Sequence, residues 1–117
     1  MKNRRWQAVA IMALGLTLSA CGDDPADTGT TREVRMLASS FSPAAVTISV
    51  GGTVRWVNDQ PIAHNITPAN PQQPGAFTTQ QVPATTGFAV AQRFQTAGVF
   101  NYSCTIHLGM TGSITVN

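Results

Sequence analysis

Hydrophobic and polar residues alternate along the chain from residue 33 onward, with the two-residue period that is typical of β-strands. The alternation is clearest at Val46, Ile48 and Val50, which are separated by threonine and serine. Shorter segments of the same kind occur at 33–36, 54–56, 88–94, 100–104 and 114–116. No segment after residue 32 shows the sustained period of an amphipathic helix. The pattern therefore predicts an all-β fold.

Turn-forming residues separate these segments and predict how the strands are connected. Gly51-Gly52 lies between two alternating segments and predicts a two-residue hairpin. Residues 68–87 are rich in Pro, Gln, Thr and Gly, so we expect an irregular crossover there, with room for one short strand. Short strands with turns between them predict a single antiparallel β-sandwich over residues 33–117.

The start of the chain has the pattern of an export signal. A basic stretch over residues 2–5 precedes an apolar run over 8–16 that is too short to cross a bilayer. Residues 18–21 read Leu-Ser-Ala-Cys, which resembles a bacterial lipobox. The resemblance implies cleavage before Cys21 and attachment of a lipid to its thiol. An ordinary signal peptide with an incidental cysteine is the alternative.

This pattern divides the chain into three parts. Residues 1–20 are the expected signal peptide, and residues 21–32 are the lipidated cysteine followed by a small, polar, flexible tether. Residues 33–117 are the expected β-sandwich domain. We therefore expect the protein in a bacterial cell envelope, anchored by lipid to a membrane and facing the periplasm or the cell exterior.

Charge and cysteine content exclude some partners and crosslinks. The chain has seven cationic and five acidic side chains, but three cations leave with the signal peptide, so the mature formal charge is 4 − 5 = −1. This set does not form the cationic cluster that nucleic-acid binding needs, so no nucleic-acid partner is expected. Because Cys21 takes lipid and Cys104 belongs to the cluster described next, no disulfide is predicted.

A thiol, an imidazole and a thioether are spaced for metal binding near the end of the chain. Cys104, His107 and Met110 have the spacing Cys-x2-His-x2-Met, so one loop after a strand can bring all three donors to one point. A second histidine, His64, lies forty residues upstream of Cys104. One thiolate, two imidazoles and a weak thioether form the donor set that selects copper for electron transfer. The sequence therefore predicts one copper ion in a His2Cys plane with a long axial methionine contact.

Taken singly, each of these residues has an ordinary structural alternative. A lone histidine such as His64 is more often a solvated loop residue, Cys104 could be a small buried hydrophobe, and Met110 could be core. Jointly these alternatives fail, because the chain has only two histidines and both fall into the same donor set. Met36 and Trp56 are assigned to the core rather than to a metal or redox role.

The residues around this donor set resemble the cupredoxins, the family of blue type 1 copper proteins. Residues 41–58 followed by His64-Asn65 resemble the amino-terminal half of that family, and residues 98–116 resemble the carboxy-terminal half. The short ligand loop is similar to that of amicyanin, whereas plastocyanin has a longer interval between the second histidine and the methionine. The resemblance implies a Greek-key antiparallel β-sandwich with one type 1 copper, held by His64, Cys104, His107 and Met110.

The resemblance also implies roles for the neighbours of the ligands. Asn65 and Thr105 would link the two ligand loops by hydrogen bonds. His107 would form an exposed edge ringed by apolar residues, with Leu108 in that ring, where redox donors and acceptors dock. Ile106 stands where amicyanin-like loops have proline, so the reduction potential of such loops cannot be carried over.

The donor set and the resemblance favour an electron carrier. The leading hypothesis is a membrane-tethered monomer that carries single electrons between redox partners outside the cytoplasm by cycling between Cu(I) and Cu(II). The alternative is a copper-binding or delivery protein without an electron-transfer role, although such proteins tend to use open sites rich in Met or His. We expect no enzyme activity, because a copper oxidase or nitrite reductase would need a second copper site, and both histidines are already used.

Overall fold

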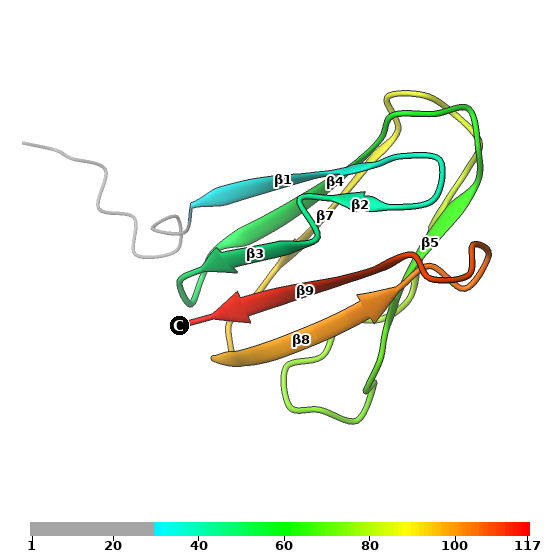
Figure 1. The fold of residues 1–117 in the computed structure, drawn as a ribbon. Coiled ribbons are helices and arrows are strands. Elements are labelled where there is room, and N and C mark those ends of the chain that lie inside the picture. Colours follow the sequence, from blue (N-terminus) through cyan, green and yellow to red (C-terminus); the bar gives the residue numbers. More distant parts are fainter. Residues whose placement is uncertain (1–29) are drawn as a thin grey trace, which may run out of the picture.

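A computed structural model describes residues 30–117, which form two β-sheets packed face to face (Figure 1). The four-stranded sheet has the order β2-β1-β4-β7, with β1 at Thr31–Met36, β2 at Phe41–Ser42, β4 at Thr53–Asn58 and β7 at Ala89–Arg93. The five-stranded sheet has the order β3-β9-β8-β5-β6, with β3 at Ala45–Ile48, β5 at His64–Pro68, β6 at Gln80–Val82, β8 at Gly98–Ser103 and β9 at Thr111–Val116. The predicted all-β sandwich is confirmed.

Both sheets are mixed, which refines the expectation of an antiparallel sandwich. β1 pairs in parallel with β4, and β3 pairs in parallel with β9, whereas all other paired strands are antiparallel. The chain crosses between the sheets after β2, β3, β4, β6 and β7. Successive strands often lie in different sheets, so strands that are neighbours within a sheet come from distant parts of the sequence. Two of these neighbouring pairs, β1 with β4 and β3 with β9, are parallel.

The hairpin predicted at Gly51-Gly52 is wrong. These glycines connect β3 to β4, which lie in different sheets and do not pair with each other. The chain does reverse here: Gly51 has a φ of 89°, and a Cβ on Gly52 would lie 2.9 Å from the carbonyl oxygen of Ser49. The glycine pair therefore marks a tight reversal, but it does not indicate which strand becomes the hydrogen-bonded neighbour.

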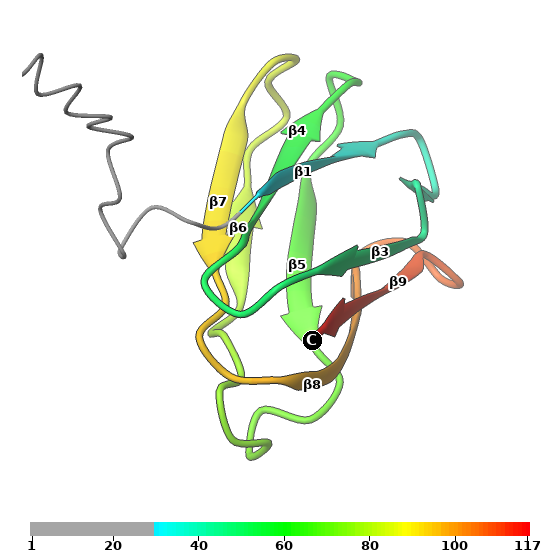
Figure 2. The same cartoon turned by 90° about the vertical axis from the view of Figure 1, so that its left-hand side faces the viewer.

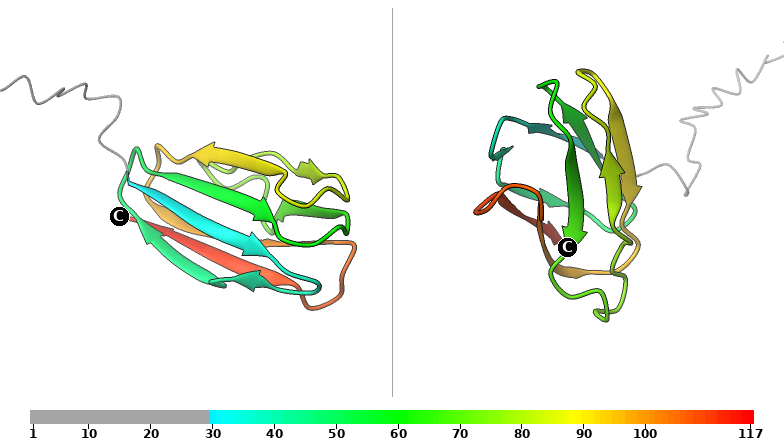
Figure 3. Two further views of the ribbon diagram at one scale, coloured as in Figure 1. Left: turned by 90° about the horizontal axis from the view of Figure 1, so that it is seen from above. Right: turned by 90° about the vertical axis from the view of Figure 1, so that its right-hand side faces the viewer.

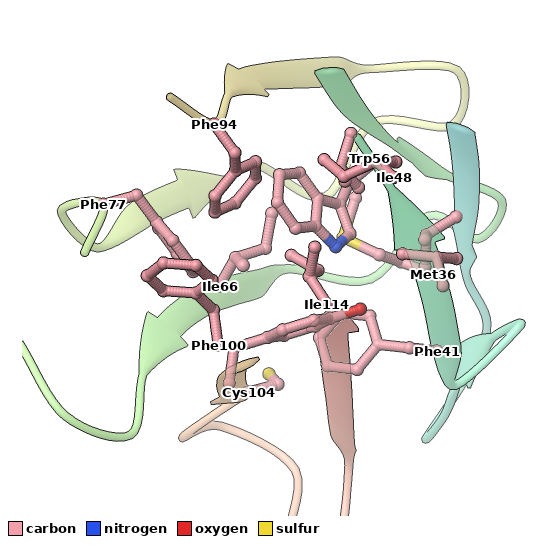
Figure 4. Close-up of a cluster of buried hydrophobic side chains, with 14 of the residues drawn as sticks. Met36, Phe41, Ile48, Trp56, Ile66, Phe77, Phe94, Phe100, Cys104 and Ile114 are labelled. Carbon is pink, nitrogen blue, oxygen red and sulfur yellow. The ribbon is translucent and has the colours of Figure 1, made fainter. Parts of the chain in front are cut away.

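The core between the sheets is apolar and rich in aromatic side chains (Figure 4). The Trp56 ring lies 5.5 Å from that of Tyr102 and 5.8 Å from that of Phe77, measured between centroids. Burial raises the pKa of Tyr102 to about 12, against a smaller opposing effect of Trp56. Met36 and Trp56 are fully buried, which confirms their assignment to the core.

The crossover predicted over residues 68–87 contains one short strand, β6, which runs beside β5 at the edge of its sheet (Figure 2). Phe77 and Val82 are buried and anchor this segment to the core. After the crossover Val90 packs against the core, but Phe88, expected on the same face, is 38% exposed. Phe88 lies just before the first residue of β7, at the end of the sheet.

The two ends of the sandwich are different. The register pairs Thr31 with Thr53 and Met36 with Asn58, so the start of β1 lies at the end away from the loop that follows β4. The loops 59–63, 83–88 and 104–110 gather at one end, whereas residue 30 and the carboxy terminus lie at the other (Figure 3). The loop-rich end contains all four residues predicted to bind copper.

The amino-terminal predictions fall mostly beyond the described part of the chain. The expected signal peptide and Cys21 lie outside residues 30–117. β1 begins at Thr31, two residues before the predicted start of the domain. Residues 30–117 contain no helix with the length and hydrophobicity needed to cross a bilayer.

Gly112 generates a stability prediction, because it leaves the space that the Tyr102 ring fills. The two residues are register partners in β8 and β9, and a Cβ on Gly112 would overlap Cζ and Oη of Tyr102. We expect Gly112→Ala to lower the free energy of unfolding by about 1–3 kcal/mol, as overpacking in a filled core does. Ser113→Ala on the same strand is the control. Chemical denaturation that finds Gly112→Ala as stable as the control would contradict this explanation.

Candidate metal centre

Three of the predicted ligands converge at the loop-rich end of the sandwich. The Sγ atom of Cys104 lies 3.9 Å from Nδ1 of His64 and 3.6 Å from Nδ1 of His107. One donor atom from each residue lies within 4.8 Å of the other two. Cys104 and His64 are buried and His107 is half-buried.

These separations fit a bound first-row metal ion. Metal bonds of about 2.3 Å to a thiolate and about 2.0 Å to an imidazole, as zinc makes them, place sulfur and nitrogen about 3.5–3.7 Å apart at tetrahedral or trigonal angles. The distance to His107, 3.6 Å, falls within this range, and the distance to His64, 3.9 Å, lies slightly above it. Soft thiolate sulfur with imidazole nitrogen is the chemistry that suits copper. The donor set therefore fits the expected metal.

Cys104 is positioned by the end of β8, and the loop after it is closed by main-chain hydrogen bonds. The N–H of Cys104 donates to the carbonyl of Met110 at 2.9 Å, and the N–H of Met110 donates to the carbonyl of His107 at 3.2 Å. β9 then begins at once, with Thr111 paired to Ser103. Met110 is only 1% exposed, so its thioether is inside the protein at the base of this loop.

His64 is the first residue of β5, and its position is set by the neighbouring strand. It pairs with Val82 of β6 and is 1% exposed. Nδ1 is turned toward the sulfur, so Nε2 would carry the proton when Nδ1 binds a metal. Burial lowers the pKa of His64, and the nearby imidazole of His107 lowers it further. A neutral imidazole is the form that binds a metal.

Two hydrogen bonds join β5, which begins with His64, to the loop that carries Cys104 and His107. The Nδ2 of Asn65 donates to Oγ1 of Thr105 at 2.6 Å, and the N–H of Thr105 donates to Oδ1 of Asn65 at 2.9 Å. The N–H of Asn65 also points at Sγ of Cys104, at 3.5 Å. Thr67 completes the set, because its hydroxyl donates to Oδ1 of Asn65 at 2.9 Å. The sequence analysis did not identify Thr67; its signal was a polar residue two positions beyond Asn65 in the same strand.

The surface around His107 is apolar. Leu108 is completely exposed, and Ile106 is 52% exposed. The positive φ of Gly109, 81°, turns the chain back toward Met110 after these two residues. His107 therefore lies between the buried sulfur on one side and exposed hydrophobic side chains on the other.

Comparisons with known proteins agree with this geometry. Residues 30–117 match the model of the family described as copper binding proteins, plastocyanin/azurin family. A plastocyanin from Scenedesmus fuscus is 36% identical over 83 residues, which are 65% of this chain and 85% of that protein. The family match covers the whole described domain.

Solved structures show the same fold. The purple cupredoxin from Nitrosopumilus maritimus superposes with a TM-score of 0.60 and 28% identity, covering 73% of this chain and 98% of its own. A copper-containing nitrite reductase from Thermus scotoductus SA-01 superposes with a TM-score of 0.65 and 30% identity over 73% of this chain. That match covers only 22% of the enzyme, so this chain corresponds to about a fifth of its length.

The family model and the identity to a plastocyanin support an electron carrier rather than an enzyme. The thiol of Cys104 and the imidazoles of His64 and His107 lie together at one end of a mixed β-sandwich, which is consistent with an electron carrier. The chain belongs to the plastocyanin/azurin family of copper-binding proteins, the cupredoxins.

Proposed function

We propose that the protein is a monomeric, membrane-tethered type 1 copper protein that carries single electrons between redox partners outside the cytoplasm. The ligands in this proposal are His64, Cys104, His107 and Met110. The observation that carries it is the convergence of two imidazole Nδ1 atoms on one buried sulfur, at distances that match shared metal ligation. A bound copper ion supplies a one-electron Cu(I)/Cu(II) couple, and soft sulfur donors favour Cu(I).

The protein holds the donor atoms in place through its main chain. Cys104 is tied to Met110 by a main-chain hydrogen bond, and its loop is tied to Asn65 through Thr105. The N–H of Asn65 faces the sulfur and stabilises negative charge there. Donors fixed in this way change position little when the charge at the site changes, which keeps the reorganisation that accompanies electron transfer small.

The surface at His107 is suited to brief contacts with other proteins. Its imidazole is the part of the site that reaches the surface, beside the exposed side chains of Ile106 and Leu108. Residues 94–117 include no charged side chain. Partners would therefore dock through a small apolar contact, which is typical of weak redox encounters.

The attachment of the chain leaves this surface free. The lipid expected on Cys21 would hold the domain through residue 30, at the end of the sandwich opposite to the loop 104–110. The copper end would then be opposite to the point of attachment, and the expected flexible tether would leave the domain free to rotate. Redox partners could reach His107 without displacing the domain from the bilayer.

The burial of the donors argues against copper delivery, the alternative function. A delivery site must expose its metal to the recipient, but Cys104 and His64 are both less than 5% exposed. Met36 cannot serve as an additional donor, because it lies in the core and is fully buried. The site is closed on the protein side and meets solvent at His107.

Copper binding generates the first prediction of this proposal. The mature protein should develop an intense blue thiolate-to-copper absorption band when Cu(II) is added, because Cys104 supplies the thiolate. Cys104→Ser should abolish the band, whereas Ser103→Ala, one residue away, should retain it. The measurement is the visible spectrum during titration. A colourless protein that binds zinc equally well would overturn the proposed function.

Leu108 generates a prediction about docking. Leu108→Asp should slow electron self-exchange between two copies about tenfold at low ionic strength, because like charges would face each other across the contact. Added salt should restore part of the rate. Val99→Asp is the matched control, since Val99 is 52% exposed on β8 near the other end of the sandwich. Equal rates in both variants, measured by NMR line broadening in mixed Cu(I)/Cu(II) samples, would count against this docking surface.

Membrane attachment generates a third prediction. The full chain expressed in a bacterium should fractionate with membranes, and Cys21→Ser should move the domain to the soluble fraction without changing its visible spectrum. A lipid-labelling experiment on both proteins would check the modification directly. A Cys21→Ser protein that stays on the membrane after its signal peptide has been removed, as judged by its mass, would refute lipid anchoring through this residue.

A further inference from the structure

Asn58 is the last residue of β4, and its polar side chain is completely buried. Its Nδ2 donates hydrogen bonds to the carbonyl oxygens of Ile62, at 2.9 Å, and Pro83, at 3.0 Å. Its Oδ1 accepts a hydrogen bond from the N–H of Gln60 at 3.2 Å. The carboxamide therefore uses both of its N–H donors and its oxygen inside the protein.

The two carbonyls that Asn58 binds lie at the same end of the strand pair that carries His64, one just before β5 and one just after β6. Ile62 precedes His64 by two residues on the way into β5. Pro83 follows Val82, which is the register partner of His64 in β6. The Asn58 side chain thus binds both the segment that enters β5 and the segment that leaves β6. Both contacts lie close to His64 and its register partner Val82.

The loop before His64 depends on this side chain. Within residues 30–117, the main chain of residues 60–63 is held by two hydrogen bonds, from Gln60 and to Ile62, and both involve the Asn58 carboxamide. The main chain of Asn58 also binds the other loop, since its N–H donates to the carbonyl of Phe88 at 2.8 Å and its carbonyl accepts from Gly87 at 2.7 Å. Asn58 is therefore the junction of β4 with both loops that flank β5 and β6.

We propose that Asn58 is a positioning residue for His64. Its carboxamide fixes the entry to β5 and the exit from β6, so that Nδ1 of His64 faces Sγ of Cys104 before any metal binds. The copper-based part of this inference rests on the proposed function, because it needs His64 as a ligand. The position of the ring is a property of the metal-free chain and is tested separately.

The test uses Asn58→Asp in the mature protein in detergent micelles. Aspartate is nearly isosteric, but it removes both N–H donors and places a carboxylate against two carbonyl oxygens. Asn70→Asp is the matched control: Asn70 is exposed, and its Oδ1 only accepts a hydrogen bond, from the N–H of Gln72 at 3.1 Å, which aspartate retains.

The first readout is amide hydrogen exchange in the metal-free protein. In Asn58→Asp, the protected amides among the paired residues His64–Ile66 and Gln80–Val82 should exchange about ten- to a hundredfold faster, while amides of β8 and β9 keep their rates. The control should leave both sets unchanged. A uniform acceleration over all strands would show a general loss of stability, and no acceleration would show no role, so either result overturns the proposal.

The second readout is the Cu(II) protein. Asn58→Asp should alter the visible absorption ratio and the electron paramagnetic resonance spectrum, because the imidazole of His64 would sit differently, while Asn70→Asp should match the wild type. An unchanged Asn58→Asp spectrum would overturn the link to copper. If the wild type itself lacks a blue site, the proposed function fails, but the exchange data still decide whether Asn58 positions His64.

A third measurement needs no substitution and covers the case in which Asn58→Asp does not fold. In the wild type, the carboxamide protons of Asn58 should exchange as slowly as the amides of β4, and those of Asn70 should exchange rapidly. Rapid exchange at Asn58 would show that its hydrogen bonds do not persist, which would overturn the proposal.

Discussion

Pairing between β5 and β8 is the constraint on which the metal centre depends. In an antiparallel pair the start of one strand lies beside the end of the other, and here Thr67 is opposite Ser103. His64 begins β5 and Cys104 follows β8, so residues forty positions apart come to within 3.9 Å. A loop alone would have to order both donors at a large entropic cost. The sheet provides this order as part of the fold.

The buried polar residues of this domain lie at the end of the sandwich that carries the metal centre. Among residues 30–117 the buried polar residues are Asn58, His64 and Asn65, and the rest of the buried set is apolar apart from cysteine and tyrosine. A buried amide without partners destabilises a protein by about 1–3 kcal/mol, so both asparagines are kept only where they bind main-chain or side-chain groups. Asn65 binds the loop of Cys104, and Asn58 binds the loop of His64. The apolar core gives stability, while these two amides determine the geometry of the loops.

The sequence predicted the strands and the grouping of His64, Cys104 and His107, because alternation and residue type can be read locally. Alternation identifies strands wherever one face is buried, and a thiol with two imidazoles is informative in a chain with only two histidines. The connection at Gly51-Gly52 was predicted wrongly, because glycine specifies a reversal and not the strand that will pair afterwards. The roles of Asn58 and Thr67 were missed for a related reason. Their partners, Pro83 and Asn65, become neighbours only through the folded chain, and an asparagine at the end of a strand looks like a turn residue in the sequence.

The charged side chains of this domain lie on different strands from the residues of the metal centre. The charged side chains of residues 30–117 all lie on the four-stranded sheet or in the loop after β4: Arg32, Glu33, Arg35, Arg55, Asp59 and Arg93. Several of them neutralise one another, since Arg35 pairs with Asp59 at 2.7 Å and Arg55 with Glu33 at 2.8 Å. The five-stranded sheet, which carries His64 and leads to Cys104, has no charged side chain. Within the centre, the polar groups that face the sulfur are the two imidazoles and the N–H of Asn65. The hydrogen bonds around Cys104 and His64 are therefore a means by which this fold can set the properties of the metal.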